Sequence, residues 1–368
     1  MSRKLAAERL PALRARSQLI HRPAGPAHPA DVLRAIAGAQ AQEPRAGRLQ
    51  LRARSRRLTA EQVERARLEE RSILRTWVMR MTIHLIPTED FGWLGPLFAE
   101  RIAAWSRRRL DALGIEGATI DRALAAVRRA LEADGPLSRS AAMEVAARAG
   151  FEVNVQTRTQ LSVLLVVEGA ACIGPDAGRE SVFVATGDWI GTPERRDRDV
   201  SLGELARRYF RAFAPATERD FASWSGLPLR DCRAGIGRIA TELDELRCRA
   251  ETLLVPRGWA ARAPRSPVVR LLPAFDTYLL GYASRAHAVD EEGARRILPG
   301  GGILRPTICV DGRFAGLWSS KGGGTRLSVM LDPFPGFNES WWPALEAEAE
   351  DIGRFEYRVG ELAGAPAV

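Results

Sequence analysis

The sequence has few of the residues that bind metals or form disulfides. Its 368 residues include four cysteines and four histidines, and none of them forms a CxxC, HxxxH or HExxH pattern. We therefore expect no metal site, no disulfide framework and no cofactor. Long apolar runs are also missing, since the longest, LSVLLVV at 161–167, is too short to cross a bilayer, and the N-terminus lacks a signal-peptide core. These features predict a cytoplasmic protein with no membrane partner.

Lysine is scarce as well. Lys4 and Lys321 are the only lysines among 54 basic residues, so arginine carries almost all of the positive charge, and the net charge is +9. Such an excess points to an anionic partner, with nucleic acid as the first candidate, because the guanidinium fork matches phosphate oxygens. A skew toward arginine also arises from the coding bias of GC-rich genomes. Charge alone leaves both explanations open.

Helical and strand periodicities recur three times in the first 256 residues. In the middle repeat, helical segments at 120–135, 136–150 and 157–169 precede β-rich flanks around the turn GPDAG. The segment GPLSRSAAMEVAARAG of this repeat aligns without a gap with APATERDFASWSGL of the third, and each has a proline and a Ser or Thr at a predicted N-cap. We interpret this as internal duplication. Three helices followed by a hairpin is the winged-helix arrangement, a relative of DNA-binding helix-turn-helix units.

The first repeat is less regular. It is expected to contain a helix around 4–20, a second from Pro29 to about Gln42, a third in 59–72 and a strand pair in 74–87. After Pro256 comes a proline- and arginine-rich connector at 257–267. Strand-like segments follow, with a hairpin turn in VDGRF at 310–314 and a late helix over 339–355.

The predicted fold is therefore α+β and mainly α. We expect five parts: a first winged helix at 1–96, a linking helix at 97–116, a second winged helix at 117–196, a third at 197–256 and a β-rich C-terminal part at 257–368.

Six stretches resemble the AlkZ and YcaQ type DNA glycosylases, a family of winged-helix DNA-binding proteins. They are GAQAQEPRAGRLQLRARSR, LRTWVMRMTIHLIPTED, GPLSR, PATERDFASWSGLP, LLPAFDTYLLGY and RPTICVDGRFAGLW, and they follow the family's order over nearly the whole chain. The resemblance implies three tandem winged helices that form a concave, basic DNA channel. It also implies a monofunctional glycosylase that excises N7-alkylguanines from double-stranded DNA, including bulky adducts and interstrand crosslinks. We expect a monomer, and self-resistance of a toxin producer is a role that the sequence leaves open.

The family's catalytic signature, glutamine, an apolar residue, then glutamine or aspartate, corresponds to Gln40, Ala41 and Gln42. Amides can suffice because an N7-alkylguanine already carries positive charge and leaves without protonation. What remains is to hold a water against the anomeric carbon and to offer dipoles to the developing charge, which Gln side chains can do. The alternative is that Gln40 and Gln42 end the second helix and are merely solvated.

Basic residues near this motif and elsewhere are candidates for contacts with DNA phosphates. The candidate DNA-binding residues are Arg45, Arg48, Arg52, Arg54, Arg80, His84, Arg285 and Lys321. Each has a structural alternative. The arginines of 45–57 could lie in a solvated, disordered or scaffold-pairing loop, His84 could be a packed strand residue, Arg285 could join Asp276 and Tyr278 in a buried network, and Lys321 could be a solvated loop tip.

Two other functions fit a winged-helix chain. One is a non-enzymatic DNA-binding protein such as a transcription regulator, and the other is a paralogue that binds damaged DNA without activity. The third helix of the middle repeat, LSVLLVVEG, is almost wholly apolar, whereas a groove reader exposes polar side chains there. This composition favours the glycosylase over the regulator.

Overall fold

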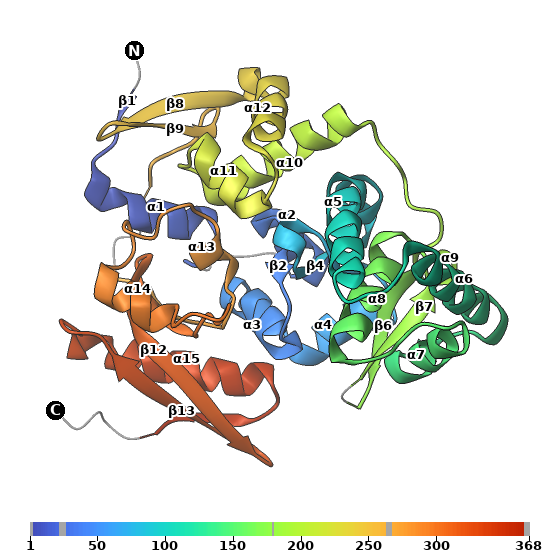
Figure 1. Ribbon diagram of the computed structural model, residues 1–368. Coiled ribbons are helices and arrows are strands. Elements are labelled where there is room, and N and C mark those ends of the chain that lie inside the picture. The colour runs from blue at the N-terminus through green and yellow to red at the C-terminus, as the bar shows by residue number, and fades with distance from the viewer. Residues whose placement is uncertain (1–2, 22–26, 179, 263–266, 364–368) are drawn as a thin grey trace. The chain divides into compact units, whose positions relative to one another are not determined.

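The computed structural model describes residues 3–21, 27–178, 180–262 and 267–363, so residues 263–266 of the predicted connector lie outside the described residues (Figure 1). The chain forms two compact units, one over 65–201 and a larger one over 1–64 and 202–368. It passes between them inside α4 (Ala60–Leu68) and α10 (Arg198–Phe213). The fold is α+β, as the sequence predicts. In the described part, no helix is long and apolar enough to span a membrane.

The 65–201 unit contains the middle repeat in the predicted order. Its helices and hairpin are α6 (Gly117–Asp134), α7 (Arg139–Arg148), α8 (Val155–Val167), β6 (Ala171–Ala177) and β7 (Glu180–Ala185) (Figure 1). Leu124 and Leu131 repeat at helical spacing on α6, and both are buried in one core with Leu164 of α8. The apolar face of α8 is therefore used for packing, as its composition predicts.

Five strands of one sheet lie in the same unit, in the order β4-β3-β6-β7-β5. The predicted strand pair of the first repeat is confirmed as an antiparallel hairpin, in register from Ile73 opposite Pro87 to Trp77 opposite Ile83. The predicted linking helix begins earlier than expected, at Phe91. The remaining elements of the unit are β3 (Ile73–Trp77), η2 (Met79–Met81), β4 (Ile83–Pro87), η3 (Thr88–Asp90), α5 (Phe91–Asp111), β5 (Leu137–Ser138) and α9 (Thr186–Ile190).

The third repeat lies in the larger unit. After α10 it contains α11 (Glu218–Ser225), α12 (Leu229–Arg238), η4 (Ala240–Glu242) and a hairpin of β8 (Leu243–Cys248) and β9 (Glu251–Pro256). Its aligned positions match the middle repeat closely. The Ser138 hydroxyl caps α7 and the Thr217 hydroxyl caps α11. One residue before each cap, Leu137 pairs with β7 and Ala216 bridges to β9.

These equivalent caps and pairings agree with an internal duplication. The five predicted parts, however, are not the compact units of the chain, because the first unit boundary falls inside α4 and not near residue 96. The division into three winged helices stays a prediction.

One expectation and one structural alternative for the first repeat are wrong. The second helix, α2 (Pro29–Ile36), ends well before Gln42 because Ala37 and Gly38 both have positive φ, 60° and 90°. The arginine-rich segment that follows, for which a loop is the structural alternative, is the helix α3 (Pro44–Arg54), with Pro44 at its first position, where a missing N–H costs no helical bond. The other elements before residue 60 are β1 (Arg3–Lys4), η1 (Ala7–Arg9), α1 (Leu10–Ser17) and β2 (Ala39–Gln40).

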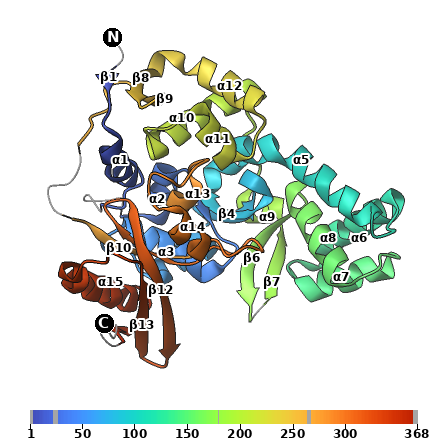
Figure 2. The same ribbon diagram turned by 60° about the vertical axis from the view of Figure 1, so that its left-hand side comes forward.

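The C-terminal part is β-rich, as predicted. Its five-stranded sheet has the order β10-β11-β12-β13-β14, and α15 lies along it (Figures 1 and 2). The expected turn in VDGRF joins β11 to β12, with Asp311 and Gly312 both at positive φ. The elements are β10 (Val269–Leu272), α13 (Thr277–Leu280), α14 (Glu291–Ile297), β11 (Thr307–Val310), β12 (Arg313–Gly323), β13 (Arg326–Pro333), η5 (Glu339–Trp341), α15 (Trp342–Phe355) and β14 (Val359–Leu362).

Candidate active site

The two candidate catalytic glutamines lie between α2 and α3 of the larger unit. Gln40 ends the short strand β2 (Ala39–Gln40), and Ala41 and Gln42 follow it before α3 begins. The Gln40 Nε2 donates a hydrogen bond to the Gln42 Oε1 at 2.9 Å. Ala41 is 1% exposed, which explains why the middle position is small and apolar. The backbone thus brings the two amides into direct contact.

The two amides differ in exposure. Gln40 is 5% exposed, whereas Gln42 is exposed to solvent. Gln40 belongs to a strand and is buried, so it is not the solvated end of a helix. One amide is therefore held inside the protein, and the other presents its NH2 group at the surface.

Sequence reasoning missed a third glutamine beside this pair. Gln50, on α3, is fully buried, and its Nε2 donates to the backbone oxygen of Gln40 at 2.7 Å. Its Oε1 accepts from the backbone N of Thr277 at 3.0 Å. The only sequence signal was its place ten residues after Gln40, which has meaning only once α3 is known to be a helix.

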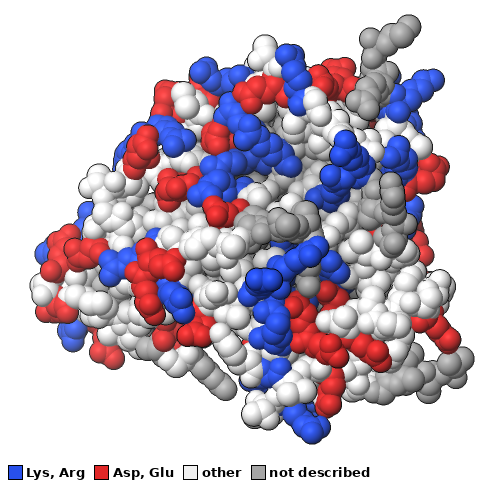
Figure 3. All heavy atoms as spheres, turned by 180° about the vertical axis from the view of Figure 1, so that it is seen from behind, with Lys and Arg blue, Asp and Glu red and all other residues white. Residues whose placement is uncertain are grey.

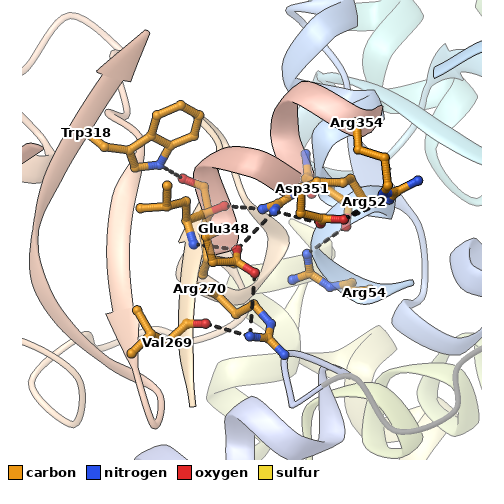
Figure 4. A network of polar contacts seen from close by, with 11 residues as sticks. Arg52, Arg54, Val269, Arg270, Trp318, Glu348, Asp351 and Arg354 are labelled. Atoms are coloured by element: carbon orange, nitrogen blue, oxygen red, sulfur yellow. Dashed lines mark hydrogen bonds and ion pairs between the residues drawn. The ribbon is translucent and has the colours of Figure 1, made fainter. Parts of the chain in front are cut away.

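The predicted phosphate contacts of Arg52 and Arg54 are wrong. Both guanidinium groups are fully buried, and carboxylates neutralise them. Arg52 Nη1 lies 2.9 Å from Glu348 Oε2 (Figure 4). Arg54 forms a two-pronged pair with Asp276 at 2.7 and 2.8 Å. A buried charge must be paired to offset its desolvation, so these arginines join α3 to α15 and to the N-cap of α13, and they are closed to DNA.

Arg45 and Arg48 lie on α3 at the rim of a pocket of about 430 Å³, which also holds Arg358. Arg45 bonds both carboxylate oxygens of Glu356, and Arg48 bonds Glu64 at 2.8 Å. Their side chains keep 43% and 27% exposure, in contrast to Arg52 and Arg54. These two arginines can therefore still reach an anion outside the protein.

His84 and Arg80 lie together in the 65–201 unit. His84 is 2% exposed, its Nδ1 bonds the backbone oxygen of Thr82 at 3.0 Å, and its Nε2 lies 3.5 Å from Arg80 Nη2. Burial, with the Arg80 charge, lowers the pKa of His84 from 6.5 to about 3. The packed alternative is therefore right for His84, which is uncharged near neutral pH and closed to DNA. Arg80 is only partly buried.

Asp276 and Tyr278 of the predicted polar set lie in a buried network, as the structural alternative predicts for them. Asp276 pairs with Arg54 and caps α13, while the Tyr278 hydroxyl donates to the backbone oxygen of Gly312 at 2.7 Å. Arg285 is not bonded to either of them. It is half-buried, its Nε makes no hydrogen bond within the described chain, and desolvation lowers its pKa.

Lys321 lies on β12 and is exposed, so it remains available as a surface cation. Basic side chains are interspersed with acidic ones on the face seen in Figure 3. In the described part of the chain, no three His, Cys, Asp or Glu side chains gather as ligands for a metal, and the four cysteines are buried and free.

Comparisons with known proteins agree on one family. The sequence model of the family described as DNA glycosylase AlkZ-like matches residues 33–355. An interstrand DNA cross-link repair glycosylase from Streptomyces sahachiroi is 28% identical over 353 residues, which cover 88% of this chain and 90% of that relative. The solved structure of Streptomyces sahachiroi DNA glycosylase AlkZ matches with a TM-score of 0.80 and 23% identity, over 98% of this chain and 100% of that one. At this identity the structural match speaks for a shared fold.

Proposed function

We propose that this chain, which belongs to the DNA glycosylase AlkZ-like family and is a DNA glycosylase, excises N7-alkylguanine from double-stranded DNA with Gln40 and Gln42 as its catalytic residues. The observation that carries the proposal is the 2.9 Å contact between the two amides, one buried and one exposed. It acts as a monomer. A pair of amides suits a leaving group that needs no proton.

In the proposed reaction, the base leaves with the electrons of its bond to the anomeric carbon. Those electrons neutralise the positive charge that alkylation placed on the ring, so no general acid is required. Water adds to the anomeric carbon and loses one proton to solvent. The proposed reaction is therefore selective for positively charged bases. An uncharged base such as uracil would leave as an anion, and the two amides supply no acid to protonate it.

The two amides have two tasks in the proposed reaction: they hold the attacking water in place, and their dipoles stabilise the developing charge. The Gln42 Oε1 accepts one hydrogen bond from Gln40, which leaves its second lone pair for an O–H of the attacking water. The oxocarbenium-like state develops positive charge, and fixed carbonyl dipoles stabilise it without reorganising. Holding the water in place accounts for a large part of the acceleration.

DNA is bound by three tandem winged helices that together form a concave, basic channel. Support for this part of the proposal comes from the matching caps and strand pairings of Ser138 and Thr217 in the second and third repeats. Arg45, Arg48, Arg80, Arg285 and Lys321 are its proposed phosphate contacts. For Arg45 and Arg48, a phosphate would replace the carboxylates of Glu356 and Glu64.

The first test is release of N7-methylguanine from alkylated duplex DNA, with wild type beside the Gln40→Ala/Gln42→Ala variant. Release by the wild type alone is expected, with DNA binding retained in the variant. Glu43→Gln is the matched control, because Glu43 is the exposed carboxylate next to Gln42 and caps no backbone N–H of α3. Loss of release in this control would mean that a carboxylate, and not an amide, activates the water.

A crosslinked duplex is the second substrate, since the Streptomyces sahachiroi relative is named for crosslink repair. Unhooking by the wild type without N7-methylguanine release would restrict the substrate to bulky adducts and crosslinks. Binding without release from either substrate would indicate a paralogue that has lost activity.

A further inference from the structure

The backbone between α2 and α3 has a fixed point at the carbonyl of Gln40. That oxygen accepts a 2.7 Å hydrogen bond from the Nε2 of Gln50, whose side chain is fully buried. A fully buried amide needs its hydrogen-bond partners inside the protein, so Gln50 is held to this oxygen. The bond fixes the peptide plane between Gln40 and Ala41, and with it the directions in which the Gln40 and Gln42 side chains leave the chain.

Gln50 is itself held at its other end. Its Oε1 accepts from the backbone N of Thr277 at 3.0 Å, at the first residue of α13. A primary amide can donate to a carbonyl and accept from an N–H at the same time, which neither a carboxylate nor a thioether can do. Glutamine, and not glutamate or methionine, is therefore what the position requires.

The Asp276–Thr277 segment, to which the Gln50 side chain is bonded, is held by a second set of contacts. Arg54, one turn after Gln50 on the same helix, donates to the Gln50 backbone oxygen and forms its two-pronged pair with Asp276, which precedes Thr277. Both members of the pair are buried. The segment that holds Gln50 in place is thus tied to α3 a second time, independently of the Gln50 side chain.

We infer that Gln50 is a positioning residue for the reaction, one that sets the geometry of the Gln40 and Gln42 amides from inside the protein through the Gln40 carbonyl. This inference rests on the proposed function, and it assigns Gln50 a part in the chemical step without contact with DNA. Loss of the bond displaces both amides together, and a displacement of about 1 Å costs on the order of a hundredfold in rate.

Gln50→Met tests the inference, with Gln18→Met as the matched control. Gln18 is also fully buried in the larger unit, and its Nε2 also donates to a backbone oxygen, that of Ala212 at 2.9 Å. Its Oε1 accepts from Arg54 Nη2 at 3.2 Å, so this control loses one contact with the anchoring arginine and none with the Gln40 carbonyl. Both changes remove one buried amide and keep the chain length, so comparable losses of thermal stability are expected. The measurements are melting temperature, affinity for a duplex with an abasic-site analogue, and the single-turnover rate of N7-methylguanine release below both melting temperatures.

Gln50→Met is expected to lower the single-turnover rate by about a hundredfold while its affinity for the duplex stays that of the wild type. Gln18→Met is expected to keep the wild-type rate. If either Met variant fails to fold, Gln50→Asn and Gln18→Asn replace them, since asparagine is one methylene too short to span from the Gln40 oxygen to the Thr277 N.

Equal rates for the Gln50 and Gln18 variants would overturn the inference and leave the proposed function standing. So would a loss of affinity without a loss of rate at saturating protein. No release by the wild type from either the alkylated or the crosslinked duplex would overturn the proposed function, and the inference with it.

Discussion

Replacing Arg54 with Met should destabilise the larger unit strongly and leave its electrostatic attraction to DNA unchanged. Arg54 is fully buried, and its guanidinium meets Asp276, which is 1% exposed, through two contacts of 2.7 and 2.8 Å. Methionine fills a similar volume but leaves the carboxylate without its partner. Breaking a buried pair in this way costs about 3–5 kcal/mol. Because a domain is stable by only about 5–15 kcal/mol, the change takes away a large share of the total.

Arg48→Met provides the contrast on the same helix. The side chains of Arg48 and Glu64 are 27% and 30% exposed, so solvent screens their pair and its loss costs at most about 1 kcal/mol. If Arg48 contacts a phosphate, its removal lowers the slope of log affinity against log salt by about 0.9. Arg54→Met should leave that slope at the wild-type value.

Urea unfolding measures the free energy of unfolding, and binding to an undamaged duplex at several salt concentrations measures the slope of log affinity against log salt. The reasoning is refuted if Arg54→Met reduces the salt slope as much as Arg48→Met does and leaves the unfolding free energy unchanged. In that event, the buried pair would have to open to expose Arg54 to DNA.

Two further predictions concern pH and backbone strain. The pKa of His84 is about 3 in the folded protein and 6.5 in the unfolded chain, so acidification below 6.5 protonates only the unfolded chain. At about pH 5 this protonation lowers the free energy of unfolding by about 2 kcal/mol, a loss that His84→Gln should not show. Urea unfolding of both proteins near neutral pH and at about pH 5 checks this, and equal pH dependence in the two would contradict it. Gly312→Ala should lower the free energy of unfolding by at least about 2 kcal/mol, because φ is +81° and a Cβ would lie 2.2 Å from the Pro11 oxygen. In Gly324→Ala the Cβ meets nothing within 4 Å, so only the φ of +55° destabilises the variant. Similar melting temperatures for the two variants would count against the close contact.

The elements with strong periodicity could be predicted from the sequence. The three helices and hairpin of the middle and third repeats, the strand pair of 74–87 and the turn at Asp311 and Gly312 all follow from apolar spacing and turn residues. These signals are local, so they need no knowledge of the rest of the chain. The Ser138 and Thr217 caps were predictable for the same reason.

The arginine-rich helix was missed because its apolar pattern is weak and its stabilising partners are remote. Arg52 forms an ion pair with Glu348 and Arg54 with Asp276, at separations of 296 and 222 residues along the chain. Nothing within a window of sequence marks which arginine is to be buried. The end of α2 was missed because Ala37 adopts a left-handed conformation that is uncommon for a residue with a Cβ.

The arrangement of α3 explains why one short segment carries both the amides and so many arginines. Arg45, Arg48 and Arg52 recur at the spacing of one helix face, while Gln50 and Arg54, one turn apart, meet the Asp276–Thr277 segment. Towards its end, α3 is bound by buried charges to α15 and to the N-cap of α13. Near its start, a few residues after Gln42, it carries the partly exposed Arg45 and Arg48. Through Gln50, α3 thus holds the backbone of Gln40, which lies ten residues earlier in the sequence. Pre-organisation of this kind is what the proposed reaction, which uses no general acid, requires, since the placement of water and dipoles would supply what a titrating group supplies in other glycosylases.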